Sequence, residues 1–194
     1  AMMIHSLDLR ANNRKLLVGP SGNGFVGKNV RFIGVPAHAG VAPEKGVNAL
    51  NAAVLAMMNI HALRETFPDE QHIRVHPMIT KGGDVVNIVP ADVRMESYVR
   101  AFTTEWMEKA NEMVTRALFA GAMAVGAQVE VQDIPGYLPL IDNPDLDEVF
   151  AANALEFVRE EEIQHGIIFA GSFDIGDLSH LMPVLHPMVG GLAG

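Results

Sequence analysis

The sequence contains eight histidines, and one of them, His38, lies where an imidazole could act on a bound ligand. It is the centre of the segment PAHAG, between an expected strand and an expected helix, with small residues on both sides. Small neighbours let a ligand approach, and the imidazole could donate to a developing oxyanion or hold a carboxylate. The alternative is a loop histidine that caps the following helix.

Two further polar residues interrupt segments that are otherwise apolar. Asn87 lies in VVNIVP, and Arg100 ends the run ESYVRA. If both side chains point into a cleft, the amide and the planar guanidinium suit a carboxylate or a tetrahedral oxyanion. The alternatives are a hydrogen bond at a sheet edge for Asn87 and a surface charge for Arg100.

Residues that could bind a metal are few and scattered along the chain. His5 ends the apolar run MMIH, where an imidazole can be a metal ligand, although two or three further ligands are needed. Asp174 and Asp177 in SFDIGDLS could add acidic ligands, or they could be turn residues whose side chains bind the local backbone.

The segment GNGFVGKN fits two nucleotide-binding patterns at once, G-x-G-x-x-G and G-x-x-x-x-G-K. Both patterns require a strand before the glycines and a helix N-terminus after them, to face the phosphate. Here a polar stretch precedes Gly22, Asn29 replaces the usual Ser or Thr after Lys28, and a strand is expected next. We therefore expect no bound nucleotide.

Composition excludes several other classes of protein. The formal net charge of −9 over 194 residues disfavours binding to nucleic acid. No apolar run approaches the roughly 20 residues of a membrane span. The absence of cysteine excludes disulfides and thiolate metal sites, and it favours a cytoplasmic location.

Between residues 28 and 134, the patterns predict strand, helix, strand, strand, helix, strand. This order is typical of a ferredoxin-like α+β domain, a four-stranded antiparallel sheet with two helices on one face. In the first helix, the spacing of Leu50, Val54 and Met57 predicts the buried stripe.

The flanking segments have a different character. Residues 2–5 read as a strand and residues 8–27 as a polar connector. Residues 144–162 read as a helix with an acidic end, followed by two short apolar strands, GIIFAG and MPVLHP. We expect these strands to belong to a different sheet, shared with residues 2–5.

Two long segments, FIGVPAHAGVAPEKGVNALNA and KGGDVVNIVPADVRMESYVRA, resemble the lid, or dimerisation, domain of the M20 family of metallopeptidases and amidohydrolases. GSFDIGDLSHLMP resembles the return into the catalytic domain of the amidohydrolase branch. The resemblance implies a lid at residues 28–136, flanked by fragments of an α/β catalytic domain at residues 1–27 and 137–194.

The resemblance also implies an activity, hydrolysis of the amide bond of an N-acyl amino acid or a related carboxylate-bearing amide. In the family, a water bound to two divalent ions (zinc, or else manganese or cobalt) attacks the amide. A lid histidine, often from the partner protomer of a homodimer, stabilises the intermediate. The implied roles are catalysis for His38, binding of the substrate carbonyl for Asn87 and of its carboxylate for Arg100, contact with the substrate for Gly171, and metal ligation for His5.

The departures from the family pattern concern the metal site. The H-x-D or C-x-H pair, the adjacent glutamates and the closing histidine are absent, which leaves one ligand of about five. We therefore expect a fragment that binds no metal and is inactive alone, with Gly22, Gly24 and Gly27 as a candidate hinge into the lid. The alternative is a non-catalytic dimerisation or ligand-binding module.

Overall fold

The computed structural model describes residues 1–7 and 14–190. The chain forms two compact units. One unit is Phe25–Gly136, and the other combines Ala1–Gly24 with Tyr137–Gly194. The chain therefore passes from one unit to the other at Gly24, inside a strand, and returns after Gly136.

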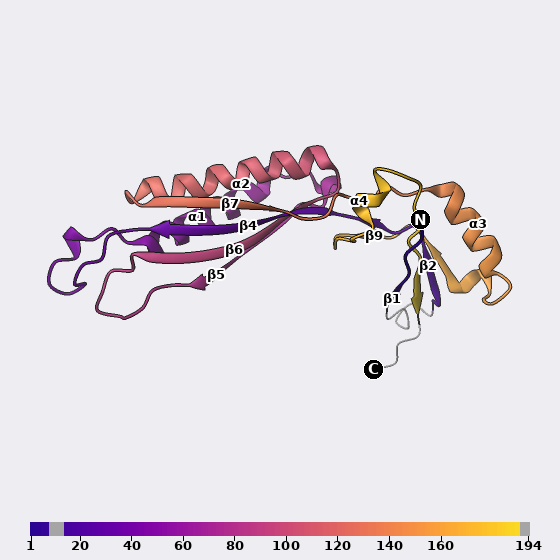
Figure 1. Cartoon of the computed structure of the whole chain (residues 1–194), viewed down its shortest axis with the longest axis horizontal. Helices are drawn as coiled ribbons and strands as arrows, with labels where there is room; N and C mark the ends of the chain where they lie inside the picture. Colours follow the sequence, from indigo (N-terminus) through magenta and orange to yellow (C-terminus); the bar gives the residue numbers. More distant parts are fainter. Residues whose placement is uncertain (8–13, 191–194) are drawn as a thin grey trace. The chain divides into compact units, whose positions relative to one another are not determined.

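The Phe25–Gly136 unit is a four-stranded antiparallel sheet with two helices on one face (Figure 1). The strand order is β5-β6-β4-β7, with β4 at Gly24–Ile33, β5 at Arg74–Lys81, β6 at Asp92–Ala101 and β7 at Gln128–Pro135. Helix α1 (Ala49–Leu63) packs over β5 and β6, and α2 (Thr104–Ala124) over β6 and β7. The expected ferredoxin-like α+β fold is confirmed.

Alternation of side chains along β6 gives the sheet one apolar face, on which the helices pack. Val93, Met95, Ser97 and Val99 are buried, while the alternate residues Arg94, Glu96 and Tyr98 are exposed on the opposite face. A strand with period-two alternation covers a core on one side and meets solvent on the other. The helices begin at polar caps, since the side chains of Asn48 and Thr103 accept hydrogen bonds from the first-turn amides of α1 and α2.

The predicted buried stripe of α1 was wrong. Val54 is 44% exposed, and the residues that are buried are Ala49, Ala52, Ala53, Ala56 and Ile60. The reason is the close approach of α2, where a Cβ at Gly121 would lie 2.5 Å from the backbone nitrogen of Ala56. Alanine and glycine make this approach possible, so the larger side chains are turned outward.

Lys28, the lysine of the apparent phosphate-binding pattern, lies inside the lid. Its side chain is fully buried, and its Nζ donates hydrogen bonds to Asp133 Oδ1 at 2.6 Å and Thr115 Oγ1 at 2.7 Å. The lysine therefore joins β4 to β7 and to α2. Burial alone would raise the pKa of Asp133, but the hydrogen bonds from Lys28 and Asn111 outweigh it and lower that pKa.

In the described part of the second unit, the chain forms two small sheets and two α-helices. The larger sheet has the order β1-β10-β2-β8, with β1 at His5–Leu7, β10 at Met188–Gly190, β2 at Leu16–Val18 and β8 at Ile163–His165. The smaller pairs β3 (Ser21–Gly22) with β9 (Ile168–Phe169). The helices are α3 (Pro144–Ala154) and α4 (Gly176–Ser179).

Four expectations for this unit need correction. The strand in GIIFAG, β9, pairs with β3 and does not share a sheet with residues 2–5. The stretch read as a connector contains β2, β3 and the start of β4; its residues 8–13 lie outside the described part of the chain. Helix α3 ends at Ala154, because the chain then turns into β8. MPVLHP is not a strand, although Leu185 in it bridges to Met2 and β10 follows it. Strands of two or three residues are too short for an alternation of apolar and polar side chains to be detected in the sequence.

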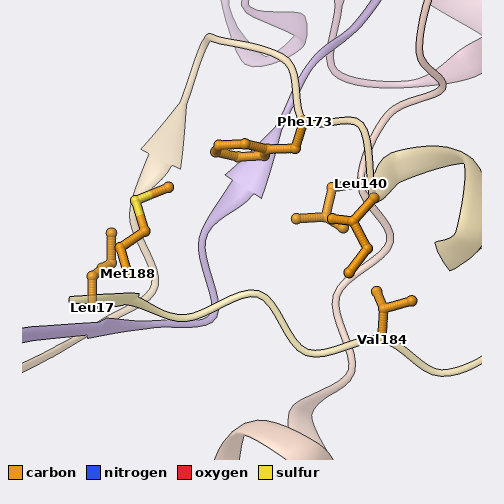
Figure 2. Close-up of a cluster of buried hydrophobic side chains, with 6 residues drawn as sticks. Leu17, Leu140, Phe173, Val184 and Met188 are labelled. Carbon is orange, nitrogen blue, oxygen red and sulfur yellow. The ribbon is translucent and has the colours of Figure 1, made fainter. Parts of the chain in front are cut away.

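The core of this unit gathers residues from segments far apart in the chain, as Figure 2 shows. Its buried members are Leu17, Leu140, Phe173, Ile175, Val184 and Met188. This cluster fixes the strand β10 and the segment before it against the ring of Phe173. None of the helices within residues 1–7 and 14–190 is long and apolar enough to cross a membrane.

Candidate functional site

The structure brings His38 and Asn87 together at one end of the lid sheet. The backbone of His38 forms a bridge with Ile88, and the Ala39 amide donates a 2.9 Å hydrogen bond to the carbonyl oxygen of Asn87. Both residues lie at the surface. The Nδ1 of His38 accepts a 3.2 Å hydrogen bond from the Gly40 amide, which places the ring proton of a neutral imidazole on Nε2.

Arg100 lies on the helix-free face of the sheet, where two aromatic rings hold its guanidinium. Its Cζ is 5.8 Å from the centroid of the Phe25 ring and 5.6 Å from that of Tyr98. The two rings contact each other at 4.9 Å between centroids. Cation–π contacts of this kind orient an arginine while leaving its N–H groups able to bind an anion.

Arg100 and the His38–Asn87 pair are at opposite ends of the lid. The pair lies beside the start of β6, since the Gly34 amide donates to the carbonyl of Ala91 at 2.8 Å. Arg100 lies eight residues beyond Asp92, the first residue of β6, which at 3.3 Å per residue is about 26 Å. These three residues of one chain therefore do not meet around one small ligand.

In the flanking unit, His5 contacts a histidine from the other end of the chain. His5 Nδ1 and His186 Nε2 lie 3.0 Å apart, a hydrogen-bond distance, and their rings meet edge to face at 4.9 Å. Residue pairing of β1 with β10 sets His5 opposite Met188, two residues from His186. His5 is exposed, whereas His186 is only 3% exposed.

Burial and, to a smaller extent, the neighbouring His5 lower the pKa of His186 to about 4, while Asp174 opposes the shift. His186 is therefore neutral near pH 7, with one ring nitrogen able to accept a hydrogen bond. The sequence does not reveal this contact, because a single histidine beside a short apolar run has no pattern.

Gly171 lies beside the same aromatic residues. A Cβ at this position would clash with the Phe169 ring, so a larger residue would require that ring to move. The Phe169 ring stacks on Phe173 at 5.2 Å, and the Phe173 ring contacts His5 at 5.9 Å and His186 at 4.4 Å. The structure thus gathers Gly171 and His5 around one aromatic cluster.

The acidic residues of the neighbouring loop do not join His5 in a metal site. Asp177 accepts a 2.8 Å hydrogen bond from the Leu138 amide, which is the structural role that a turn residue would have. Within residues 1–7 and 14–190, no three or more His, Asp or Glu side chains are grouped so that they could hold a metal. The donor set described here fits one imidazole ligand, from His5.

Fold and site together define a class: an α+β unit of the ferredoxin-like kind, joined to a second unit in which His5 and Gly171 lie around one aromatic cluster. Residues 22–121 match the peptidase dimerisation domain of the M20 family. The chain belongs to this family, whose members include hydrolases of C–N bonds.

Curated relatives match the chain over part of their own length. The Xaa-Arg dipeptidase of Mus musculus is 32% identical over 163 residues, which cover 81% of this chain and 37% of that protein. Carboxypeptidase G2 of Pseudomonas sp. (strain RS-16) is 40% identical over 93 residues, 46% of this chain and 20% of that protein. The matched part of the chain therefore spans little more than a third of the dipeptidase and a fifth of the carboxypeptidase.

Solved structures share the fold over nearly the whole chain. The aminobenzoyl-glutamate utilization protein from Klebsiella pneumoniae has a TM-score of 0.76 at 20% identity, covering 98% of this chain and 49% of that one. The aminopeptidase PepT from Bacillus cereus has a TM-score of 0.69 at 25% identity, covering 89% and 45%.

Proposed function

We propose that this chain is the dimerisation domain, with flanking catalytic-domain segments, of a metal-dependent amidohydrolase. The substrate would be an N-acyl amino acid or a related amide with a free carboxylate. The observation that carries the proposal is the pairing of His38 and Asn87 on adjoining segments, tied by the 2.9 Å hydrogen bond from Ala39. In the whole hydrolase, this chain would be joined to the family's remaining metal ligands.

The two side chains suit the charge that develops when an amide is hydrolysed. With its Nδ1 occupied by the Gly40 amide, His38 presents Nε2–H as a donor, and the side-chain amide of Asn87 is a second donor on the adjoining segment. Two donors aimed at the carbonyl oxygen stabilise the tetrahedral oxyanion more than they stabilise the planar amide. This difference lowers the barrier to hydrolysis.

Arg100 is suited to the carboxylate of the substrate. Its guanidinium is fixed by Phe25 and Tyr98, so little side-chain entropy is lost when its N–H groups form paired hydrogen bonds with a carboxylate. The names of several relatives support a carboxylate-bearing substrate, among them the indole-3-acetyl-aspartic acid hydrolase of Enterobacter agglomerans and a p-aminobenzoyl-glutamate hydrolase of Escherichia coli.

The metal ions of the proposed hydrolase would, when bound, lower the pKa of a coordinated water and polarise the amide carbonyl. From this chain, His5 would supply one ligand, because its ring is exposed at the start of a strand and one ring nitrogen is held by His186. The other ligands would come from the rest of the whole hydrolase.

The separation of about 26 Å along β6 supports a site that would be built from two protomers. His38 and Asn87 of one protomer would complete the site that contains Arg100 of its partner. In a two-fold dimer, each protomer would contribute His38 and Asn87 to its partner's site and would receive the partner's His38 and Asn87 in its own.

The outer face of α1, beside the edge strand β5, is the surface that we propose for the homodimer. None of the 15 residues of α1 is Asp, Glu, Lys or Arg, and Val54 and Met58 on it are 44% and 62% exposed. A helix that faces water normally carries charge on that side, as α2 does with Glu105, Lys109 and others. An uncharged exposed face next to an unpaired strand is typical of an interface.

Activity of the whole hydrolase tests the proposal. Hydrolysis of N-acyl amino acids that requires added zinc, manganese or cobalt, and that is lost when His38 is replaced, would support it. Metal-independent activity, or none with any carboxylate-bearing amide, would contradict it.

A second function, a non-catalytic dimerisation module, is favoured by one observation. Residues 1–7 and 14–190 hold no cluster of three metal ligands. The two proposals differ in the sequence that adjoins this chain: the H-x-D and paired glutamates of the family belong only to the hydrolase.

A further inference from the structure

We propose that the helix-free face of the lid sheet (Figure 1) carries a pocket for the basic side chain of an amino acid that also bears a carboxylate. Arg100 would bind the carboxylate, the aliphatic stem would lie over Gly27, and Glu96 would bind the ammonium or guanidinium at the end of the stem. The inference deepens the proposed function, and it rests on that function in one respect, that this ligand is the substrate.

An open cavity of about 440 Å³ lies on this face of the sheet. Gly27, in the central strand β4, is part of its floor, and Tyr98 of β6 and Ile134 of β7 flank it. Tyr98 is 51% exposed and Ile134 is 42% exposed. The cavity is therefore apolar where the stem would lie, and burial of aliphatic carbon there would favour binding.

Charges of opposite sign flank Tyr98 along β6. The Arg100 guanidinium lies against two rings that line the cavity, those of Phe25 and Tyr98. Glu96 lines the cavity itself and is exposed. Within residues 1–7 and 14–190, neither Arg100 nor Glu96 forms an ion pair, so both charges are available to a ligand.

The spacing of these residues suits a long side chain. Alternate residues of a strand lie on the same face, so Glu96, Tyr98 and Arg100 form one row with steps of about 6.6 Å. The Cα atoms of Glu96 and Arg100 are then about 13 Å apart, and the reach of the two side chains shortens the interval between their charges. A long unbranched basic side chain can span that interval, whereas an acidic one would be repelled by Glu96.

A second arginine supports the binding of an anion at the Arg100 end. Pairing of β5 with β6 sets Arg74 directly opposite Arg100, and like charges in opposed positions repel each other. Elsewhere on the lid sheet, three basic side chains are neutralised by one carboxylate, that of Asp92, at 2.7–3.5 Å. No described residue neutralises Arg74 and Arg100 in this way, so a bound carboxylate would relieve their repulsion.

The test is an NMR titration of this chain, labelled with ¹⁵N, with three probes. They are Nα-acetyl-L-lysine, Nα-acetyl-L-norleucine, which lacks the ammonium, and the C-terminal amide of Nα-acetyl-L-lysine, which lacks the carboxylate. A ligand of this size held by one face of a sheet should have a Kd of about 1 mM.

We expect the norleucine probe to bind about three- to fivefold more weakly than the lysine probe, which is the contribution of an exposed ion pair. The amide should bind about tenfold more weakly, because it cannot form charge-assisted hydrogen bonds with Arg100. Equal affinities for the lysine and norleucine probes would overturn the assignment of a basic side chain. No binding of any probe at about 20 mM would overturn the pocket.

Two variants sharpen the test. Glu96→Gln should remove the preference for lysine over norleucine, and Glu108→Gln, exposed on α2, should keep it. A Cβ at Gly27 would lie 3.4 Å from the Ile134 Cβ and 3.6 Å from Tyr98 Cε1, which is ordinary van der Waals contact. Gly27→Ala should therefore fold, occupy part of the floor and weaken both probes about fourfold, the contribution of one buried CH₂ group.

Unchanged binding in Gly27→Ala would contradict a stem that lies over this residue. A preference for lysine that persists in Glu96→Gln would contradict the role of Glu96. Because the titration does not depend on activity, the hydrolase proposal can fail while this preference stands, and the preference can be absent from an active hydrolase.

Discussion

The Ala39 amide donates a 2.9 Å hydrogen bond to the carbonyl oxygen of Asn87. This bond ties two loops that are nearly fifty residues apart, and it brings the two donors expected to act on a substrate carbonyl to one end of the lid. Because the segment after His38 is paired with the segment around Asn87, a change in one side chain should leave the position of the other unchanged. The first prediction depends on this independence.

Replacement of His38 by alanine in the whole hydrolase should lower kcat by about 10²–10³-fold, with a smaller change in KM, because the lost donor acts mainly on the transition state. The melting temperature should be unchanged, since the ring is not part of the buried core. His165→Ala, an exposed histidine, is the matched control. A kcat within a few-fold of wild type would exclude the oxyanion role.

Arg100→Lys should reduce kcat/KM for a carboxylate-bearing amide by about 10- to 100-fold, because a charge-assisted paired hydrogen bond contributes about 1.5–3 kcal/mol. The same variant should hydrolyse an amide without a carboxylate as well as wild type does. Arg94→Lys, on the same face of β6, controls for general charge effects. Equal losses on both substrates would show that Arg100 does not bind the carboxylate.

Met58→Glu should convert the chain to a monomer, because it places a charge in the uncharged outer face of α1. Light scattering at high protein concentration measures the change directly. Met123→Glu on α2, where the side chain is 77% exposed, should leave the dimer intact. If the α2 variant dissociates and the α1 variant does not, the interface lies on the β7 side of the lid.

The buried pair in the lid should respond asymmetrically to mutation. Asp133→Asn leaves the Lys28 ammonium buried without a counter-charge and should destabilise the fold by about 3 kcal/mol. Lys28→Met should cost less than about 1 kcal/mol, because the Asp133 carboxylate is 43% exposed and keeps its bond to Asn111. Urea denaturation measures the free energy of unfolding of both variants. Equal losses of stability would contradict a buried Lys28 charge that Asp133 compensates.

A pH dependence should come from Asp147, next to the left-handed turn at Gly19. Burial and the neighbouring Asp142 raise its pKa from 3.8 to about 7. A raised folded-state pKa contributes stability that is complete below pH 3.8 and is lost as the pH rises to 7. Asp147→Asn should therefore raise the melting temperature more at about pH 8 than at about pH 4.5, and the exposed Asp145→Asn should not. A pH-independent effect would contradict the shift.

Much of the lid could be predicted from sequence because its elements are long. Alternation along β6 and the apolar spacing of the two helices define the ferredoxin-like order without any tertiary information. The buried stripe of α1 could not be predicted, since it depends on the approach of Gly121 from α2. The helical spacing of apolar residues does not show which face is buried. That face can carry alanines packed against a close neighbouring helix, or it can carry larger residues.

The candidate site was predictable only in its parts. The residues that stand out by residue type and by resemblance to the family are His38, Asn87, Arg100, Gly171 and His5. Their grouping was not predictable, because it depends on strand pairing: the bridge at His38 joins two residues, and β1 meets β10 across nearly the whole chain. The contact between His5 and His186 could not be predicted for the same reason, since the two residues are 181 positions apart.

The central claim is that the site of the whole hydrolase takes His38 from one protomer and Arg100 from the other. The direct measurement is the activity of a mixture of His38→Ala and Arg100→Ala protomers, dissociated and allowed to re-form dimers. Random pairing makes about half of the dimers mixed, each with one intact site, so the mixture should recover about a quarter of wild-type activity although each variant alone is nearly inactive. A mixture no more active than the average of the two variants would contradict the claim.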